Sequence, residues 1–247
     1  MSSKIRIIVN GANGKMGALA CETLANDSQF DLVAQAGRQD NLGQLINAHQ
    51  ADVVLDLTRA DCAWDNAQII IQQGARPVIG TSGLTDEQIN QLKKQCQALN
   101  LGALIVPNFS LGAVLMMHFA KLAAAHFSEV EIIEAHHQQK LDAPSGTAIK
   151  TAEMIAIARK VNPNQLDLKE LVPGARGGLS HQIPIHSLRL PGIIARQTVE
   201  FGGVGETLTI THNSIDRQCF MPGVILACQS VMNLDGLMYG LESILLN

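Results

Sequence analysis

Short apolar segments alternate with amphipathic ones through the first part of the chain. The apolar segments are bounded by polar residues and glycines, which predicts buried parallel strands over Ile5–Val9, Asp31–Ala36, Asp52–Leu57, Arg76–Ile79 and Ala103–Val106. Apolar residues recur at helical spacing between the later strands, over Asp61–Gln73 and Thr85–Leu99. The alternation predicts an α/β fold with a Rossmann-type, doubly wound parallel sheet, in which ligands bind beyond the carboxyl ends of the strands.

A different pattern begins after residue 108. It predicts a long apolar helix over Leu111–Phe127, a strand over Val130–Ala135, and a helix from Ser145 or Gly146 to Lys160. Three more strands are predicted over Ile183–Leu190, Ala195–Gly202 and Glu206–His212. The links between these three strands are too short for crossover helices, so we expect them to pair antiparallel. The pattern therefore predicts a second, α+β domain with an open mixed sheet.

The remaining segments set the domain boundaries. Residues 161–180 contain several Pro and Gly residues, which predicts a long loop of the kind that often covers a site, with Arg176 as its guanidinium. We expect a last helix over Ser214–Met232 and a return of the apolar tail to the first domain. The expected division is a dinucleotide-binding domain of residues 1–108 and 217–247, and a substrate-binding and oligomerisation domain of residues 109–216.

The turn after the first strand carries a glycine motif with the spacing G-x-x-G-x-x-G, in which Asn13 occupies the usual middle glycine position. A Gly-rich turn between a buried strand and a helix lets the backbone approach a pyrophosphate, and the helix N-terminus faces the charge. A tight turn without a ligand is the alternative. The motif predicts a dinucleotide site formed by Gly11, Ala12, Asn13, Gly14, Lys15 and Met16.

Two arginines bear on the choice of cofactor. Arg38 follows the second strand, where Asp or Glu usually meets the ribose 2′-hydroxyl of NAD, and the nearest carboxylate here is Asp40. A guanidinium at this place can pair with the 2′-phosphate of NADP, which favours NADPH over NADH; a solvated loop arginine is the alternative. Arg59, after the third strand, either faces the same phosphate or caps the next helix.

A cluster of cationic side chains lies in the stretch from Glu134 to Ala148, which reads EAHHQQKLDAPSGTA. His136, His137 and Lys140 lie close together in it, and the N–H groups of the following helix add positive partial charge beside them. This combination suits a small anion that carries carboxylates. A solvated histidine loop that leads into a helix is the alternative.

The full stretch closely resembles the signature segment of the dihydrodipicolinate reductase family, now named 4-hydroxy-tetrahydrodipicolinate reductases, and the resemblance extends over nearly the whole chain. It implies reduction of (2S,4S)-4-hydroxy-2,3,4,5-tetrahydrodipicolinate to (S)-2,3,4,5-tetrahydrodipicolinate with loss of water, in lysine biosynthesis through diaminopimelate. It also implies NADPH or NADH as cofactor and a homotetramer. In the family an acidic residue often stands where this chain has Gly37, and that departure argues against a strong NADH preference.

The resemblance implies a role for each site residue. His136 matches the family's catalytic acid, since an imidazole suits proton transfer near neutral pH. Lys140 matches the lysine that pairs with a substrate carboxylate and stabilises developing charge, and His137 matches its carboxylate-binding neighbour. The second carboxylate is expected at the helix start formed by Ser145, Gly146 and Thr147. The segments that line the nicotinamide correspond to Gly80, Thr81, Ser82, Val106, Pro107, Asn108 and Phe109.

Two acidic residues of the signature stretch have simpler interpretations. Glu134 either packs in the strand or orients a histidine, and Asp142 is interpreted as a turn residue and not as a base.

Composition narrows the class of protein. The 247 residues are 47% hydrophobic and 16% charged, which predicts extensive burial and argues against disorder. A net charge of −4 without a basic run argues against nucleic acid as a partner, so substrate carboxylates must be met by a local positive patch. The five cysteines lack C-x-x-C spacing, so neither a disulfide framework nor a metal site is expected. With no membrane-spanning stretch and no signal-peptide pattern, we expect a cytoplasmic protein that does not bind membranes.

Two other functions fit parts of the sequence. An amino-acid dehydrogenase on the same two-domain plan would act on an acyclic substrate and would not need the second carboxylate site. A catalytically inactive NADP-binding sensor would share the first domain but would not need the cluster of His136, His137 and Lys140. The presence of both features favours a reductase that acts on a small dicarboxylate.

Overall fold

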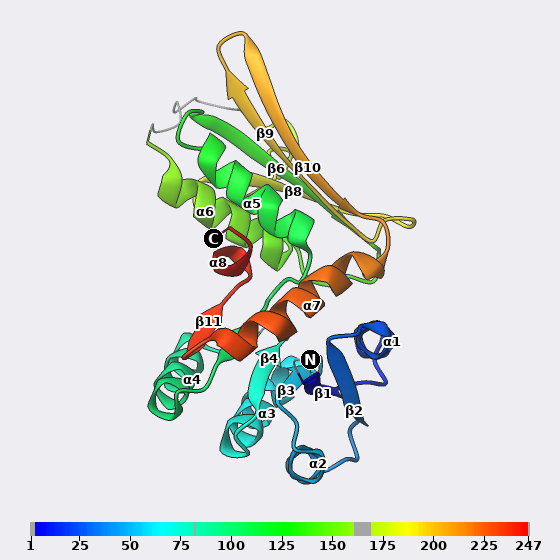
Figure 1. The fold of residues 1–247 in the computed structure, drawn as a ribbon. Helices are drawn as coiled ribbons and strands as arrows, with labels where there is room; N and C mark the ends of the chain where they lie inside the picture. Colours follow the sequence, from blue (N-terminus) through cyan, green and yellow to red (C-terminus); the bar gives the residue numbers. More distant parts are fainter. Residues whose placement is uncertain (1–2, 82, 161–168, 247) are drawn as a thin grey trace. The chain divides into compact units, whose positions relative to one another are not determined.

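The structure is a computed structural model that describes residues 3–81, 83–160 and 169–246 (Figure 1). The chain forms two compact units. One comprises Met1–Leu111 and Phe220–Asn247, and the other comprises Gly112–Cys219. We refer to them as unit 1 and unit 2.

Unit 1 contains a six-stranded sheet in the order β11-β5-β4-β3-β1-β2, in which every neighbouring pair is parallel. The central strands are buried along their length, which explains their nearly continuous apolar sequences. The strands are β1 (Ile5–Asn10), β2 (Phe30–Ala36), β3 (Val53–Asp56), β4 (Arg76–Ile79), β5 (Ala103–Ile105) and β11 (Leu237–Tyr239). The predicted Rossmann-type sheet is confirmed, and so is the return of the tail to the first domain, because β11 pairs with β5.

The sheet of unit 1 is covered by helices that pack in two groups. α1 contacts α7, whereas α3 contacts both α2 and α4. The α2–α3 side buries Ile8, Val54 and Ile70 in one apolar cluster, and the α3–α4 side buries Ile79 and Leu92 in another. The helices are α1 (Lys15–Asn26), α2 (Leu42–His49), α3 (Ala60–Gln72), α4 (Asp86–Leu99), α7 (Met221–Ser230) and the short α8 (Glu242–Leu245).

Unit 1 differs from the prediction in α2, in the start of α7 and in β11, which was not predicted as a strand. The helix α2 was not predicted; it begins after Asn41, whose side chain accepts a hydrogen bond from the N–H of Gln44. The expected helix over Ser214–Met232 is wrong at its start, because Ser214 still belongs to a strand. A 3-10 turn at Arg217–Phe220 comes next, and α7 starts at Met221 with a proline in its first turn.

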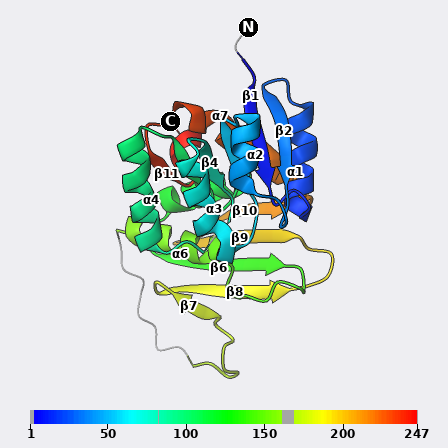
Figure 2. The same cartoon turned by 90° about the horizontal axis from the view of Figure 1, so that it is seen from below.

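Unit 2 contains a five-stranded mixed sheet in the order β10-β9-β6-β8-β7, visible in Figure 2. β6 pairs parallel with β8 and antiparallel with β9, and the outer pairs are antiparallel. The expected antiparallel pairing is confirmed for 195–202 with 206–212, but 183–190 does not pair with 195–202, since β6 lies between these two strands. The strands are β6 (Glu129–His136), β7 (Gly178–Ser180), β8 (Ile183–Arg189), β9 (Ala195–Gly203) and β10 (Glu206–Ser214).

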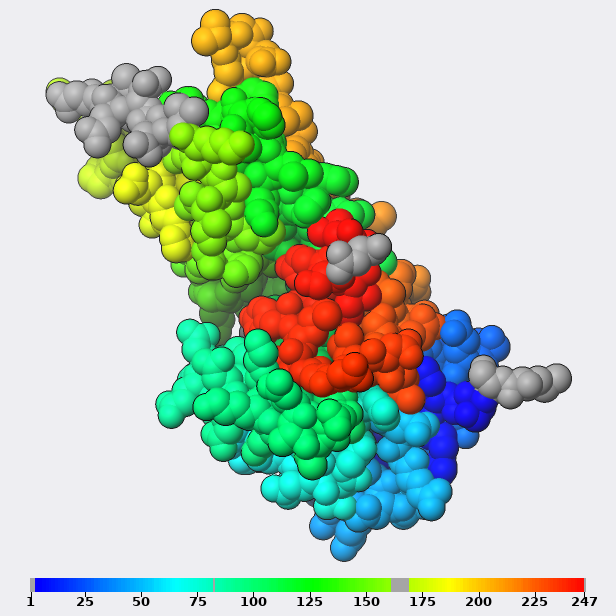
Figure 3. All heavy atoms as spheres, turned by 60° about the vertical axis from the view of Figure 1, so that its left-hand side comes forward, coloured from blue at the N-terminus to red at the C-terminus, as the bar shows by residue number. Residues whose placement is uncertain are grey.

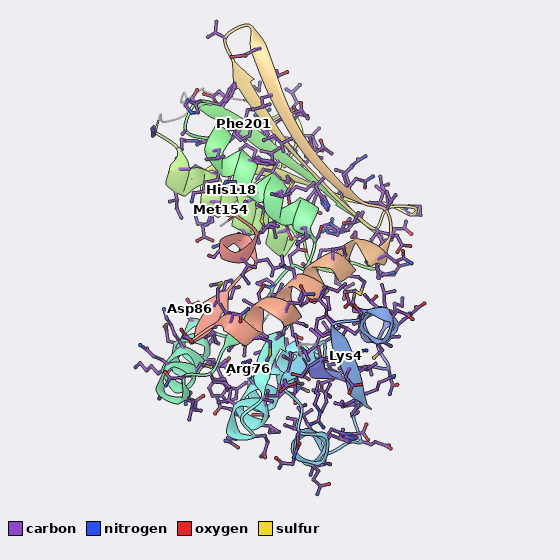
Figure 4. All side chains as sticks on the ribbon, in the orientation of Figure 1. Lys4, Arg76, Asp86, His118, Met154 and Phe201 are labelled. Atoms are coloured by element: carbon purple, nitrogen blue, oxygen red, sulfur yellow. The ribbon has the colours of Figure 1, made fainter. Side chains whose placement is uncertain are left out.

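Two helices, α5 (Leu111–Ala123) and α6 (Gly146–Ala158), lie on one side of this sheet (Figure 1). Alternate residues of β6 and β9 are buried, and Ile132 stands opposite Val199. Phe201, labelled in Figure 4, is buried with its ring centroid 5.7 Å from that of Phe127. The hairpin of β9 and β10 projects from the rest of unit 2 (Figure 3).

The predicted loop over 161–180 is only partly described, because residues 161–168 lie outside the described residues. Its last residues form β7, which was not predicted. Arg176 forms an ion pair with Glu131 of β6. Within the described ranges, no helix combines the length and the apolar character needed to cross a membrane.

Candidate functional site

The glycines of the turn after β1 are required by close packing. Gly11 has φ +85°, and a Cβ there would lie 2.8 Å from the carbonyl oxygen of Leu57, just beyond β3. A Cβ at Gly17, in the first turn of α1, would overlap the carbonyl oxygen of Gly11. The motif therefore lets α1 start directly against the ends of β1 and β3.

The start of α1 suits a phosphate. The N–H groups of Gly11 and Ala12 already donate to the carbonyl oxygen of Ala36, at 2.9 and 3.1 Å. Gly14 is the N-cap residue, and no side chain in the described part of the protein caps the helix. The N–H groups of the first turn, from Lys15 onward, are thus the ones directed at a ligand.

The helices that follow other strands of the sheet differ from one another in how their first turns are capped. Side chains cap α2 and α4, through Asn41 and Thr85, and Thr85 forms a capping box with Gln88. The N-cap residue of α3 is Arg59, which like Gly14 makes no side-chain capping bond. Because β1 and β3 are neighbours, the starts of α1 and α3, which lack side-chain caps, follow adjacent strands. This arrangement fits a dinucleotide pyrophosphate.

The two departures from the usual fingerprint face each other. An ideal Cβ at Gly37 would lie 2.8 Å from Nδ2 of Asn13, so the asparagine amide fills space beside the glycine. Asp40 turns back to this point, and its Oδ2 accepts the N–H of Gly37 at 2.7 Å. Arg38 is exposed and adjoins this group.

Arg59 is held by an exposed ion pair with Asp61, at 2.7 Å. Such exposed pairs contribute little free energy, so the guanidinium can move to a phosphate at small cost. The buried Asp56 stabilises the turn that carries Arg59. Its oxygens accept hydrogen bonds from the N–H of Thr58 and from the side-chain amide of Asn66, both at 3.0 Å. Burial raises the pKa of Asp56, and these hydrogen bonds oppose the rise.

The ends of β3, β4 and β5 converge at Gly80. A Cβ there would lie 2.6 Å from both Leu57 and the ring of Phe109, which is buried. The hydroxyl of Thr81 donates to the carbonyl oxygen of Thr58 at 2.9 Å. Oδ1 of Asn108 accepts the N–H of Ser110 at 2.9 Å, and the predicted Ser82 lies outside the described residues.

The signature stretch begins on β6, where the spacing of two places Glu134 and His136 on the same face. Nδ1 of His136 lies 2.5 Å from Oε2 of Glu134, whose side chain is fully buried. In the register of the sheet, His136 stands opposite Arg189 of β8. Arg189, which is far from Glu134 and His136 in sequence, thus meets them at the end of one parallel strand pair.

Arg189 forms two hydrogen bonds to Glu134, from Nη1 to Oε2 at 3.0 Å and from Nη2 to Oε1 at 2.9 Å. It also donates to the carbonyl oxygens of Lys140 at 3.2 Å and Asp142 at 2.5 Å. Burial alone would raise the pKa of Glu134, but the hydrogen bonds from His136, Arg189 and Ser187 outweigh burial and lower it to about 2. Glu134 is therefore a buried carboxylate that stays ionised.

Lys140 is close to the histidines but is paired. Its ammonium lies 2.9 and 2.8 Å from the two carboxylate oxygens of Asp142. The ion pair lowers the pKa of Asp142, and 64% of the Asp142 side chain is exposed. Nδ1 of His137 is buried and has no hydrogen-bond partner among the described residues.

The start of α6 adjoins Glu134 directly. Ser145 is buried; its hydroxyl accepts the N–H of Ala148 at 3.2 Å as the N-cap, and its own N–H donates to Oε1 of Glu134 at 3.3 Å. Its hydroxyl is thus used in capping. Gly146 is exposed, with open space around the position of a Cβ.

A second buried chain of hydrogen bonds supports the first turn of α6. Nε2 of Gln197 donates to the hydroxyl of Thr151 at 2.7 Å, and this hydroxyl donates to the carbonyl oxygen of Thr147 at 2.7 Å. Gln197 stands opposite Glu134 in the sheet, so both networks reach α6 from adjacent strands.

Sequence reasoning missed Arg189 and Gln197. Each is a long polar residue inside a strand that the sequence predicted, at a position that shares its face with buried apolar residues. That mismatch was a usable signal for a buried polar network. The partner of either residue depends on the register with β6, which the pattern of one chain does not contain.

Comparison with protein families covers nearly the whole chain. Residues 5–109 match the model of the dihydrodipicolinate reductase N-terminus, and residues 112–245 match that of the dihydrodipicolinate reductase C-terminus.

Individual relatives are similar along their full length. The chain is 67% identical over 242 residues to 4-hydroxy-tetrahydrodipicolinate reductase of Legionella pneumophila (strain Paris), covering 98% of this chain and 100% of that one. It is 54% identical over 241 residues to the protein of the same name from Coxiella burnetii (strain Dugway 5J108-111), covering 98% and 99%. Among solved structures, dipicolinate-bound dihydrodipicolinate reductase from Paenisporosarcina sp. TG-14 superposes with a TM-score of 0.90 at 45% identity, covering 98% and 100%.

Proposed function

The chain belongs to the dihydrodipicolinate reductase family, and we propose that it reduces (2S,4S)-4-hydroxy-2,3,4,5-tetrahydrodipicolinate to (S)-2,3,4,5-tetrahydrodipicolinate. The reaction consumes one NAD(P)H and one proton and releases one water. It is a step of lysine biosynthesis through diaminopimelate. Family membership along the whole chain supports this function, and the ordered cluster around His136 is the structural observation that carries it.

The residues of unit 2 bind the substrate and supply the proton in this proposal. Lys140 binds one carboxylate after its ammonium leaves the exposed Asp142, and His137 adjoins it. The N–H groups of Gly146 and Thr147, with the hydroxyl of Thr147, bind the second carboxylate at the start of α6, which Ser145 caps. His136 donates the proton to the ring as it gains electron density.

The residues of unit 1 hold the cofactor. The bound nicotinamide supplies the hydride. The first turn of α1 meets the pyrophosphate and Arg59 faces the 2′-phosphate, while the ends of β4 and β5, with Gly80, Thr81 and Asn108, line the nicotinamide half. Leu57 and Phe109 leave no room for a side chain at Gly80, so only its backbone is presented there.

NADPH is the preferred cofactor in this proposal. Gly37 carries no side chain that could meet a ribose 2′-hydroxyl, and the exposed Arg38 beside it suits a 2′-phosphate. Asp40 opposes this preference, but its carboxylate is turned to the N–H of Gly37.

Three further points belong to the proposal. Unit 1 serves as the dinucleotide-binding domain and unit 2 as the substrate-binding and oligomerisation domain of a homotetramer, which suits the largely exposed strand β10 at the edge of its sheet. The protein works in the cytoplasm, where its five free cysteines would stay reduced.

The test is oxidation of NADPH with freshly prepared substrate, followed by absorbance. We expect oxidation only when the substrate is present, and a higher kcat/KM with NADPH than with NADH. The variant His136→Gln should lose on the order of a hundredfold in kcat with KM changed by less than about threefold, because it removes the proton donor and keeps the carboxylate contacts.

The matched control is His126→Gln, the same substitution at an exposed position beyond α5. It should retain wild-type kinetics. Wild-type protein that does not oxidise NADPH with this substrate would exclude the function, and a His136→Gln variant with wild-type turnover would remove His136 from catalysis.

A further inference from the structure

We propose that Glu134 and Arg189 form a positioning pair that fixes the tautomer of His136, so that Nδ1 keeps its proton and Nε2 delivers the catalytic one. The proposal rests on the proposed function and assigns to it two residues that do not touch the substrate in it. It also names the atom from which the proton leaves.

The first step of the argument is the charge of Glu134. Its side chain is fully buried, and a buried carboxylate is costly unless it is paired and hydrogen-bonded. Both of its oxygens accept from Arg189, at 2.9 and 3.0 Å, and Oε1 also accepts the N–H of Ser145. These donors keep the group ionised, and an ionised carboxylate can only accept hydrogen bonds.

The second step concerns the imidazole. Oε2 of Glu134 lies 2.5 Å from Nδ1 of His136, so Nδ1 must be the donor in this contact. The neutral ring then carries its hydrogen on Nδ1 and a lone pair on Nε2. The protonated ring carries both hydrogens, and loss of the Nε2 hydrogen to the substrate returns it to the same neutral tautomer without any change at Nδ1.

The third step is the place of Arg189 in the sheet. Arg189 faces His136 across the parallel pair of β6 and β8, and it also holds the backbone carbonyls of Lys140 and Asp142. Glu134 on β6 and Arg189 on β8 are thus charged groups that face His136, and the ion pair of Lys140 and Asp142 follows in the loop whose backbone Arg189 binds. The guanidinium of Arg189 thus holds in place both the buried carboxylate and the loop that carries Lys140.

A merely structural role makes a different prediction. If Glu134 served only to hold the start of α6 through Ser145, its loss would weaken binding of dicarboxylates as much as turnover. If it fixes the tautomer, turnover falls and binding is retained. Dipicolinate, the ligand bound in the Paenisporosarcina relative, is a suitable probe of binding.

The experiment combines ¹⁵N NMR of imidazole nitrogens, dipicolinate titration and steady-state kinetics on the full chain. In the wild type we expect a protonated Nδ1 in the neutral ring of His136. In Glu134→Gln the amide no longer imposes this tautomer, so the signal should shift to the Nε2-protonated form or to a mixture. The value of kcat should fall on the order of a hundredfold, with dipicolinate Kd changed less than about threefold.

The sheet offers a matched control on its other face. Glu131, also on β6, lies 2.8 Å from Nε2 of His186, which makes a second Glu–His pair outside the site. Glu131→Gln should leave kcat and the spectrum of His136 unchanged.

Two further measurements keep the proposal testable if Glu134→Gln does not fold. The wild-type spectrum alone overturns it when the neutral ring of His136 is protonated at Nε2. Arg189→Lys, which keeps the charge and loses the paired N–H groups, should lower kcat by about threefold to thirtyfold. Wild-type kcat in either folded variant would also overturn the proposal. Failure of the wild type to oxidise NADPH would instead refute the function, and the spectrum would still report the tautomer.

Discussion

Asp142 occupies the ammonium group that the substrate carboxylate is proposed to bind. Both of its oxygens contact Lys140, at 2.8 and 2.9 Å, and more than half of its side chain is exposed. In the proposed function, substrate binding replaces one carboxylate by another on the same lysine. The pairing with Asp142 therefore opposes binding of a substrate carboxylate in this proposal.

Asp142→Asn should tighten binding of dicarboxylates. An exposed ion pair contributes about 0.2–1 kcal/mol, so we expect a decrease in dipicolinate Kd of roughly twofold to fivefold, measured by calorimetric titration. The value of kcat should stay within about twofold, because the backbone carbonyl that Arg189 binds is retained.

Glu153→Gln is the control for this prediction. It breaks a comparable exposed pair, with Lys150 on α6 at 3.0 Å, away from the signature loop. It should leave the Kd unchanged. A higher dipicolinate Kd in Asp142→Asn would show that Asp142 organises Lys140 and does not compete with the ligand.

At the scale of elements, α1 depends on the absence of a side chain at Gly17. A Cβ at this position would overlap the carbonyl oxygen of Gly11, which is backbone and cannot rotate away. Gly17→Ala should therefore shift the start of α1. We expect NADPH Kd to rise at least about tenfold, measured by fluorescence titration, together with a lower Tm of unit 1.

Gly43→Ala in α2 is the matched control. Its Cβ would meet its nearest neighbours at 3.6 Å, an ordinary van der Waals distance. Because alanine favours helix over glycine by about 0.5–1 kcal/mol, this variant should be as stable as the wild type or more stable. Unchanged NADPH binding in Gly17→Ala would mean that the turn tolerates a displaced helix.

Elements were predictable from sequence where their patterns were long or strongly apolar. The central strands of unit 1 are largely buried, so apolar runs such as Ile5–Val9 stood out. The short β11 and α2 did not, because three or eight residues hold too little periodicity. Pairing was the harder part: the pattern identified β8 as a strand but could not show that β6 lies between β8 and β9.

The candidate site shows the same difference between local sequence patterns and strand pairing. His136, His137 and Lys140 are neighbours in sequence, so the signature stretch revealed them together. Arg189 reaches them only through the register of β6 and β8, and its ion pair with Glu134 is a tertiary contact. Local patterns predict the residues that act on a ligand better than those that hold them.

At the scale of the whole molecule, the ionisation of Glu134 makes the free energy of unfolding depend on pH. Its pKa is lowered from 4.5 to about 2 on folding, so between these values the unfolded chain binds a proton that the folded chain does not. The stabilisation is fully present above about pH 4.5 and is lost as pH falls toward 2. The difference corresponds to on the order of 3 kcal/mol.

Urea unfolding at pH 7, 5, 4 and 3, followed by NMR signals of β6, measures this loss. We expect the unfolding free energy of unit 2 to decrease more steeply in the wild type than in Glu134→Gln, which has no carboxylate to protonate. Parallel decreases in the two proteins would assign the acid sensitivity to other carboxylates.

The edge strand β11 has a consequence for how the protein is made. Roughly 130 residues separate β5 from β11, and all of unit 2 lies between them in sequence. At ribosomal rates of about 5–20 residues per second, the outer edge of β5 stays unpaired for on the order of ten seconds before β11 is synthesised. During that interval a nascent chain exposes an unpaired parallel edge, which is a template for pairing with another chain.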